Sequence, residues 1–224
     1  MTKKEIVKRY VLFIIGLFFL ALGVAFTKHG ELGVSPLSSV SNVMSWRFDS
    51  LSLGTWLIIW NCTMILGQIM VLRKNFQWMQ LLQLPLSFLF GWFTDLGVLI
   101  VSPIPLPNYP VKLIVVVIGI VILSFGIVLT LIANVIMNSG EAFVKAIADT
   151  IHTDFGNVKV AFDIFCVALA VVLSLIFFDL RIIGVREGTI LSALFAGMII
   201  KFFNRKLKEP LNVLLRDKAE RIRQ

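Results

Sequence analysis

The chain has 224 residues, of which 58% are hydrophobic and only 15% are charged, and its formal net charge is +8. Soluble domains carry about 25% charged residues and about 45–50% apolar residues. This composition therefore excludes an ordinary soluble domain and indicates a membrane protein.

Six apolar stretches are long enough to cross a hydrocarbon core of about 30 Å as helices. The first stretch follows a basic start, as in a cleaved signal peptide, but its length and its similarity to the fourth stretch favour a retained span. We therefore predict a single all-α polytopic membrane domain with six transmembrane helices. The predicted spans are residues 10–27, 51–72, 78–101, 112–133, 158–178 and 182–203.

Two shorter segments, residues 31–47 and 134–151, are too polar to cross the membrane comfortably. Each contains a helix-start signal, the pair Ser35–Pro36 in the first and the run Asn138–Glu141 in the second. We predict two short re-entrant or amphipathic helices that enter the membrane without crossing it. The alternative, two full crossings, gives eight spans. The charge distribution opposes it, because it moves the two basic residues between the second and third spans to the outside.

The distribution of basic residues also predicts the topology. With six spans and a cytoplasmic N-terminus, most Lys and Arg residues fall on the cytoplasmic side, which is the pattern of the positive-inside rule. Both termini are then cytoplasmic, and the net charge requires no nucleic-acid partner. The predicted outer segments hold five of the 21 basic residues, namely Lys28, Arg47, Lys112, Arg181 and Arg186.

The chain contains an internal repeat with an offset of roughly a hundred residues. Residues 15–27 match residues 118–130, and the segment that ends at Asn61 matches the segment that ends at Asp163. If the short segments do not cross the membrane, each half has three spans. The odd number then turns the second half upside down and gives an inverted 3+3 repeat. The matching small residues are Gly16 with Gly119, Gly23 with Gly126, Gly54 with Gly156, Ser87 with Ala193, and Gly91 with Gly197.

The repeat divides the chain into four parts. Residues 1–101 form the first membrane repeat and residues 112–204 form the second. Residues 102–111 are a proline-rich outer linker, because their prolines prevent a continuous helix. Residues 205–224 form a basic, amphipathic cytoplasmic tail, which we expect to bind anionic lipid headgroups, with a solvated, frayed tail as the alternative.

Small residues four positions apart on the third and sixth spans permit close approach of helix backbones, which favours helix association in lipid. We therefore expect these two spans to pack closely at the centre of the molecule, with contact to a ligand as the alternative role of these residues. The predicted packing residues are Ser87, Gly91, Gly188, Ser192, Ala193 and Gly197.

Two repeat-related polar residues lie inside predicted spans, where polar side chains are costly. Asn61 lies in the second span and Asp163 in the fifth, so the two can converge near the midplane. Asp163 is the strongest candidate for a proton or cation acceptor, and the alternative is a structural carboxylate satisfied by a neighbouring Ser, Asn or Lys159 near the cytoplasmic interface. Glu141, at the start of the second short helix, is a further candidate, and the alternative for it is a helix cap.

The starts of the two short helices form a second group of candidate residues. Their backbone N–H groups, hydroxyls and positive dipole ends suit an anionic group of a ligand. The repeat pairing of two such helix starts makes this signal stronger than an ordinary turn. The predicted substrate-binding residues are Ser35, Ser38, Ser39, Asn61, Asn134, Asn138, Ser139, Glu141 and Asp163.

The sequence has no recognisable catalytic or metal-binding motif. His29 and His152 lie in different repeats, and Cys62 and Cys166 lie inside predicted spans, far from any CxxC spacing. We interpret the two thiols as buried and inert. We therefore predict no enzymatic activity, no metal site and no cofactor.

Three segments resemble a known family. ELGVSPLSSVS at residues 31–41, LSLGTW at 51–56 and GVREGTILSALFAGMIIKFF at 184–203 are similar to parts of the YczE/YyaS/YitT group of bacterial membrane proteins. The resemblance extends over residues 10–205. It implies a multi-pass protein of the bacterial cytoplasmic (inner) membrane, and it implies neither a substrate nor catalytic residues.

The resulting hypothesis is a secondary-transporter-like protein that moves a small polar or anionic solute, with proton coupling through Asp163 or Glu141. Two alternatives stay open. One is a membrane-embedded solute-binding subunit that needs an energising partner, and the other is a non-transporting accessory or lipid-binding protein. The expected partners are the lipid bilayer and a small-molecule solute, and the sequence leaves a homodimer open.

Overall fold

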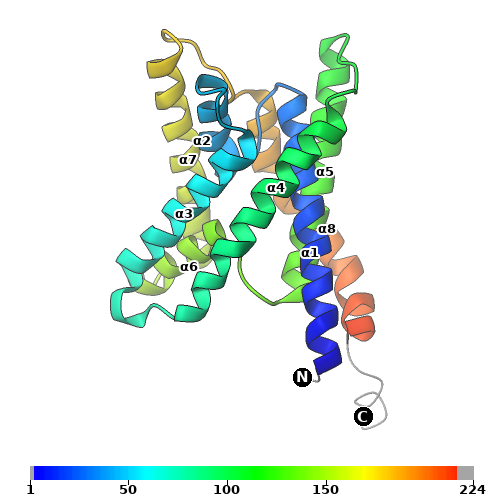
Figure 1. Cartoon of the computed structure of the whole chain (residues 1–224), viewed down its shortest axis with the longest axis vertical. Helices are drawn as coiled ribbons and strands as arrows, with labels where there is room; N and C mark the ends of the chain where they lie inside the picture. The colour runs from blue at the N-terminus through cyan, green and yellow to red at the C-terminus, as the bar shows by residue number, and fades with distance from the viewer. Residues whose placement is uncertain (1–2, 216–224) are drawn as a thin grey trace.

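The computed structural model describes residues 3–215, and this part of the chain is helical, without strands. Figure 1 shows long helices that run roughly lengthwise, with two short helices among them. The helices are α1 (Lys3–His29), α2 (Pro36–Arg47), α3 (Leu53–Leu72), α4 (Gln83–Val101), α5 (Tyr109–Ala133), α6 (Ser139–Ile151), α7 (Phe155–Phe177) and α8 (Glu187–Leu215), with 3-10 turns at Arg73–Asn75 and Trp78–Leu82.

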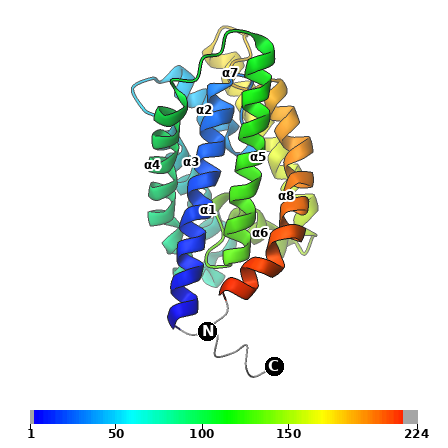
Figure 2. The same ribbon diagram turned by 90° about the vertical axis from the view of Figure 1, so that its right-hand side faces the viewer.

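Six helices are long and apolar enough to cross a membrane, which indicates a multi-pass membrane protein. They are α1, α3, α4, α5, α7 and α8, and they correspond to the six stretches predicted from the sequence. The start of α1 and the end of α8 lie at the same end of the bundle (Figure 2), where Lys8 Nζ donates to the carbonyl of Leu214 at 3.0 Å. An even number of long helices, each running along the bundle, brings the two ends of the described chain to the same end.

The boundaries of α8 differ from the prediction at both ends. The helix begins at Glu187 rather than at residue 182, because the preceding loop contains left-handed residues, Asp179 with φ 49° and Gly184 with φ 81°. At the other end, α8 continues past Pro210 into the segment predicted as a separate tail.

Part of the predicted tail therefore belongs to the bundle. Leu207, Leu211 and Leu215 of α8 pack against Val128 and Ile132 near the end of α5. This contact explains why the helix does not stop at residue 204. The remainder of the predicted tail, residues 216–224, lies outside the described residues.

The two short helices begin in the interior of the bundle and run to opposite ends, α2 toward the upper end and α6 toward the lower end of Figures 1 and 2. Their first turns are neighbours, because a Cβ added at Gly140 would lie 2.6 Å from the side chain of Leu37. The buried residues Gln68 and Gln83 hold the start of α6 in place. Their amides exchange hydrogen bonds at 3.0 and 3.2 Å, and Gln68 Nε2 also donates to the carbonyl of Ser139 at 3.1 Å.

The tightest long-range packing joins α1 to α5. On α1, a Cβ at Gly16 would press on Leu129 at 2.8 Å. On α5, a Cβ at Gly119 would press on Phe26 at 2.9 Å. Gly119 lies as far along the chain from Gly16 as Leu129 lies from Phe26. The two contacts are therefore reciprocal, because each helix supplies a glycine and the matching partner.

A second glycine pair on the same two helices repeats this pattern. A Cβ at Gly23 would overlap Leu123, and a Cβ at Gly126 would overlap Leu20. Gly126 lies as far along the chain from Gly23 as Leu123 lies from Leu20, so this contact is reciprocal as well. The four glycines allow the backbones of α1 and α5 to touch, which gives these helices the largest share of helix contact in the molecule.

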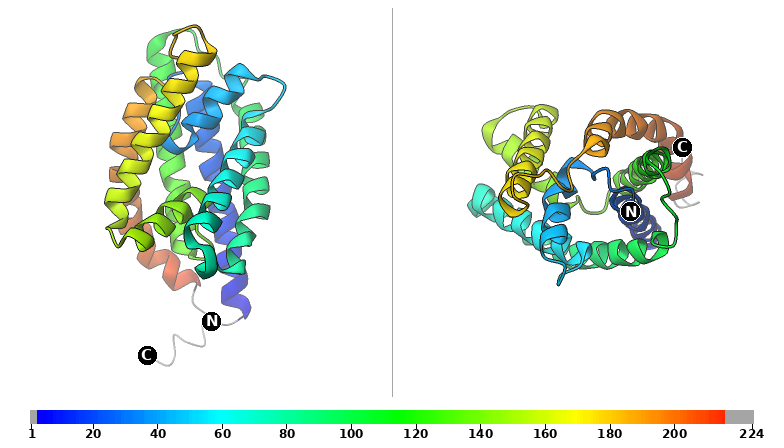
Figure 3. Two further views of the ribbon diagram at one scale, coloured as in Figure 1. Left: turned by 90° about the vertical axis from the view of Figure 1, so that its left-hand side faces the viewer. Right: turned by 90° about the horizontal axis from the view of Figure 1, so that it is seen from above.

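The expected close packing between the third and sixth spans is wrong. Within residues 3–215, α4 packs on α1 and α3, whereas α8 packs mainly on α5, and α4 and α8 are not packed on each other. The physical reason is that the glycine-lined α1–α5 pair stands between them, as the view from above in Figure 3 shows.

Candidate functional site

A cavity of about 310 Å³ lies where the two short helices begin. Most of the helices contribute to its wall, including both short ones. Cavities of this size lie at the lower end of the range that holds small ligands, about 300–1,000 Å³. The polar and charged residues of the wall are Ser35, Ser38, Trp60, Asn61, Asn138, Glu141, Lys159, Asp163 and Ser192.

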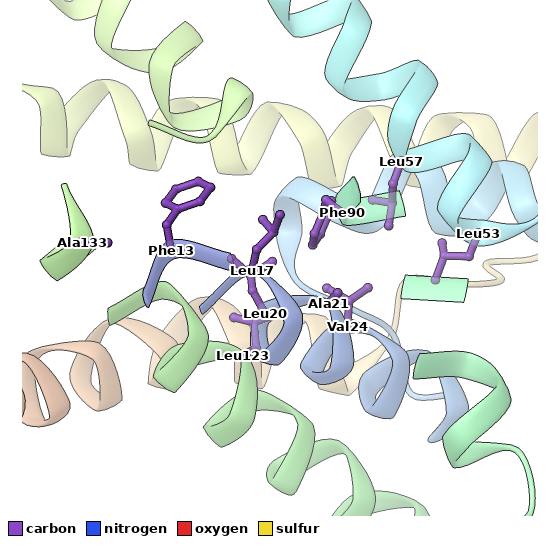
Figure 4. Packing of buried hydrophobic residues seen from close by; sticks show 10 residues of the cluster. All are labelled: Phe13, Leu17, Leu20, Ala21, Val24, Leu53, Leu57, Phe90, Leu123 and Ala133. Atoms are coloured by element: carbon purple, nitrogen blue, oxygen red, sulfur yellow. The ribbon is translucent and has the colours of Figure 1, made fainter. Parts of the chain in front are cut away.

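Most of the wall is apolar. Figure 4 shows Leu20, Val24, Leu57, Phe90 and Leu123, which belong to one buried cluster and also line the cavity. They come from α1, α3, α4 and α5, so the rigid part of the bundle shapes this side. An apolar wall favours an apolar body in any molecule that binds here.

The charged residues of the cavity come from α6 and α7. Lys159 and Asp163 lie one helical turn apart on α7 and form an ion pair, as the alternative interpretation of Asp163 anticipated. Glu141 stands at the third position of α6. It forms neither a hydrogen bond nor an ion pair with any residue in the range 3–215, and Lys159 attracts its charge only from a longer distance. The cavity thus holds two carboxylates and one ammonium group.

Two buried hydrogen-bond donors at the cavity are free. Asn61 is 4% exposed, and its Nδ2 has no partner within the described part of the chain. The indole Nε1 of the neighbouring Trp60 is also buried and without a partner there. Buried polar groups are normally hydrogen-bonded, so two orphaned donors on neighbouring residues of the wall are unusual, and both atoms are enclosed by the surrounding protein.

The starts of α2 and α6 both reach the cavity. Ser35 precedes α2 and Asn138 precedes α6, and neither side chain caps its helix. Ser35 Oγ donates instead to Ser38 Oγ at 3.1 Å. The N–H groups and the dipole of each first turn are therefore not neutralised by these caps, and both helices present their positive ends at the same cavity.

Three predicted substrate-binding residues lie elsewhere. Ser39 is fully buried, and its Oγ donates to the carbonyl of Pro36 at 2.6 Å. Asn134 ends α5 in the left-handed conformation and lines a neighbouring hollow of about 90 Å³, which shares Asn138 and Glu141 with the central cavity. Ser139 faces a very small cavity beside Ser87. The other predicted residues, Ser35, Ser38, Asn61, Asn138, Glu141 and Asp163, share the central cavity.

The predicted packing residues divide into two groups. Ser87 and Gly91 on α4 and Gly188 on α8 are buried in helix contacts. Ser192, Ala193 and Gly197 on α8 instead line the cavity. The small side chains of this second group leave space that a larger residue would fill.

Two residues of functional interest were not predicted as part of a site. Trp60 adjoins Asn61 and could have been suspected from an indole deep within an apolar span. Gln68, which positions the start of α6, is likewise an amide in an apolar helix, where a polar side chain calls for a buried partner. Neither signal identifies the partner without the fold.

One side of the cavity is open between two helices. We call this side, bounded by Lys159 and Asp163 of α7 and by Ala193 and Gly197 of α8, the α7–α8 opening. Ala193 and Gly197 line the cavity and are exposed at the surface, and a Cβ added at Gly197 would meet no atom within 4 Å. In the described part of the chain the two helices do not pack along each other, and Figure 3 (right) shows them apart.

The corresponding side of the first half is closed. There α3 packs along α4. A Cβ added at Gly54 would overlap the carbonyl oxygen of Gly91, and a Cβ added at Gly91 would lie 2.6 Å from the carbonyl oxygen of Gly54. Ser52 Oγ donates to Asp95 at 2.6 Å, and the Gly54 N–H donates to Asp95 at 2.8 Å, so α4 caps the start of α3. We call this the α3–α4 contact.

Comparison with known families identifies the chain at the level of its family. Residues 7–205 match the family of unknown function DUF6198, and the chain belongs to that family. The match covers the same region as the resemblance noted in the sequence, but it does not extend to the YczE/YyaS/YitT name. No curated protein and no solved structure shows significant similarity to the chain.

Proposed function

We propose that the protein is a secondary transporter that moves a small solute through the central cavity, with proton coupling. The observation that carries this proposal is the meeting of two helix starts at a cavity that also holds an unpaired carboxylate, Glu141. Interrupted helices whose ends meet at mid-depth are the usual means by which transporters bind polar groups inside a membrane.

The proposal includes two inverted halves of three spans each. The reciprocal α1–α5 contacts support it, because residues related by a two-fold axis contact each other in both directions. Side-chain hydrogen bonds repeat as well. Thr27 donates to the carbonyl of Val24 at 2.8 Å, and Thr130 donates to the carbonyl of Ile127 at the same distance. In this arrangement α2 and α6 are re-entrant helices that enter from opposite faces, and both termini are cytoplasmic.

Alternating access follows from the difference between the two halves. In this state the α3–α4 contact is closed and the α7–α8 opening is open. We propose that α7 and α8 close on Gly156 and Gly197 in a second state, while α3 and α4 separate at Gly54 and Gly91. The α1–α5 pair is the fixed axis of this exchange.

Glu141 is the proposed proton carrier. A carboxylate in a mostly apolar cavity without a cation at contact distance is costly in its ionised form, so it binds a proton or a positively charged ligand. Asp163 is already paired with Lys159 and contributes less. We propose no catalytic role for either residue.

Solute-driven proton movement in proteoliposomes tests this function. Vesicles that contain a pH-sensitive dye are mixed with a panel of small solutes, and the dye signal reports proton flux. We expect at least one solute to move protons with the unaltered protein and none with Glu141→Gln. The matched control is Glu187→Gln, which changes an exposed carboxylate that pairs with Arg186. Full retention of pH-dependent flux in Glu141→Gln combined with Asp163→Asn would contradict the coupling.

A lipid-binding accessory role is the second candidate function. The observation that favours it is the α7–α8 opening itself, which leaves a mostly apolar cavity accessible from the side. This role predicts a copurifying lipid in the cavity and no solute-driven flux. Lipid extraction followed by mass spectrometry, together with the flux assay, separates the two functions.

A further inference from the structure

We infer that the cavity binds an amphipathic organic cation, a molecule with a small apolar body and a positively charged head, which enters from the bilayer through the α7–α8 opening. This inference rests on the proposed function and names the substrate class. Its parts are the charge of the head, the character of the body and the route.

The charge of the head follows from the ionisable residues of the wall. Glu141 and Asp163 supply two negative charges, and the ammonium of Lys159 is already engaged by Asp163. An anionic ligand would therefore meet an unpaired carboxylate and no free cation on the described wall. A cationic ligand would instead neutralise Glu141, which no residue in the range 3–215 contacts as an ion-pair partner. The positive ends of α2 and α6 offset part of this negative charge, but they act through backbone N–H groups and carry no formal charge. Among the ionisable residues of the described wall, Glu141 is the one without an ion-pair partner, and it favours a cation over the anionic solute considered from the sequence.

The body of the ligand follows from the volume and the apolar wall. An apolar cavity of about 150 Å³ holds one benzene molecule. The cavity here is about 310 Å³, which accommodates a single ring or a short branched chain together with a small head group. Leu57, Phe90 and Leu123 are among the apolar residues that line it, so most of the ligand's contact would be apolar.

The remaining polar groups of the wall suit the boundary between body and head. Trp60 lines the cavity, and an aromatic side chain at the wall attracts the cationic head. Asn61 presents an amide without a partner at Nδ2. The Asn61 Nδ2 and the Trp60 Nε1 are both enclosed by protein, so a ligand reaches them only if the wall shifts.

The route follows from the α7–α8 opening. Ala193 and Gly197 of α8 line the cavity and are exposed, so this side of the helix is not covered by another part of the described chain. This surface belongs to a helix that is apolar enough to cross a membrane, so the opening faces the bilayer rather than bulk water. Molecules reaching it must first partition into lipid, which amphipathic cations do and strongly polar solutes do not.

Binding of three matched probes tests the substrate class. The probes are benzyltrimethylammonium, which has both ring and positive charge, tetramethylammonium, which lacks the ring, and phenylacetate, which has a ring and a negative charge. Affinities are measured by calorimetry on the full chain in lipid nanodiscs. We expect benzyltrimethylammonium to bind at least about tenfold more tightly than either other probe. Equal or tighter binding of phenylacetate, or no binding of benzyltrimethylammonium, would overturn the inference.

Variants at Glu141 test the charge partner. Glu141→Gln is expected to weaken benzyltrimethylammonium binding by about tenfold or more, because it removes the charge and keeps the size. Glu141→Asp keeps the charge and should retain most of the affinity, which excludes a mere folding defect. Glu187→Gln is the control and should bind like the unaltered protein. Unchanged affinity in Glu141→Gln would overturn the assignment.

A pair of substitutions on α8 tests the route. Gly197→Phe fills the opening, whereas Met198→Phe adds a ring at the adjacent, exposed position. We expect Gly197→Phe to slow benzyltrimethylammonium association by about tenfold and Met198→Phe to leave it unchanged. Equal association rates in the two variants would overturn the lateral route.

The outcomes separate this inference from the proposed function. Benzyltrimethylammonium binding that depends on Glu141, without any flux in proteoliposomes, upholds the substrate class and refutes transport. Proton-coupled flux of another solute, without benzyltrimethylammonium binding, upholds transport and refutes the substrate class.

Discussion

The α3–α4 contact and the α7–α8 opening are built from matching small residues, yet one is closed and the other is open. Gly54 and Gly91 bring α3 and α4 together, whereas the matching Gly156 and Gly197 touch no residue of the other helix. Small residues therefore permit close packing without enforcing it.

The capping of the two helices explains part of the difference. The start of α3 has a local cap, since Ser52 Oγ accepts from Thr55 N at 3.1 Å, and it is also tied to the neighbouring helix, since Gly54 N and Ser52 Oγ donate to Asp95 of α4. The start of α7 is capped locally, since Gly156 N donates to Asp154 at 2.8 Å. One cap ties two helices together, and the other leaves α7 independent of α8. A closed pair and a movable pair thus arise from similar segments.

Filling the two matching glycines should give the largest difference between the halves. Gly91→Leu forces a side chain into Ile58 and the carbonyl of Gly54, so we expect a loss of about 3 kcal/mol in stability or failure to fold. Gly197→Leu projects into open space and should leave stability unchanged. Thermal unfolding in detergent, followed by the intrinsic fluorescence of the protein, measures both. If the two substitutions lowered the stability equally, Gly197 would be packed against another helix, and the α7–α8 opening would be closed in the folded protein.

Removal of the two caps should give a smaller difference. Asp95→Ala removes two hydrogen bonds between helices and should cost about 2 kcal/mol, whereas Asp154→Ala removes a local cap and should cost about 1 kcal/mol. Partial proteolysis of the detergent-solubilised protein adds a second measurement. Only Asp95→Ala should make the loop before α3 more susceptible, and equal susceptibility would contradict the role given to this cap.

The α1–α5 pair provides a comparison in which we expect no difference between the two halves. Gly23→Ala and Gly126→Ala introduce the same overlap on opposite helices, with Leu123 and Leu20 respectively. We expect both to lower stability by about 2 kcal/mol, equal within error. The unfolding temperatures of the two variants, compared side by side, check this. A clear inequality would weaken the two-fold relation between α1 and α5.

Much of this architecture is readable in the sequence because the membrane imposes simple lengths. The six apolar runs predicted the six long helices, and the helix-start signals at Ser35 and Asn138 predicted where α2 and α6 begin. The start of α8 was misplaced, because residues 182–186 are apolar enough for a helix but follow left-handed turns that hydropathy does not reveal.

The composition of the cavity was predictable only in part. Asn61 and Asp163 were paired through the repeat, and the structure does bring them to one cavity. Gly197 was interpreted as a packing residue, because a small residue that touches a helix and one that borders an open space look alike in sequence. The reciprocal amide pair of Gln68 and Gln83 required the fold to be seen, since only packing brings the two residues together.

The separation of the helices on the two sides of the cavity tests the central claim most directly. Spin labels are placed at the exposed positions Ile59 and Phe88 on α3 and α4, and at Ala161 and Leu194 on α7 and α8, with both native cysteines replaced by alanine. Dipolar coupling is recorded in nanodiscs with and without benzyltrimethylammonium. Without ligand, the account predicts a short α3–α4 separation and a longer α7–α8 separation. With ligand, it predicts a changed population of a second state, in which the α3–α4 separation is the longer and the α7–α8 separation the shorter. A single short separation on both sides, unaltered by ligand, would contradict it.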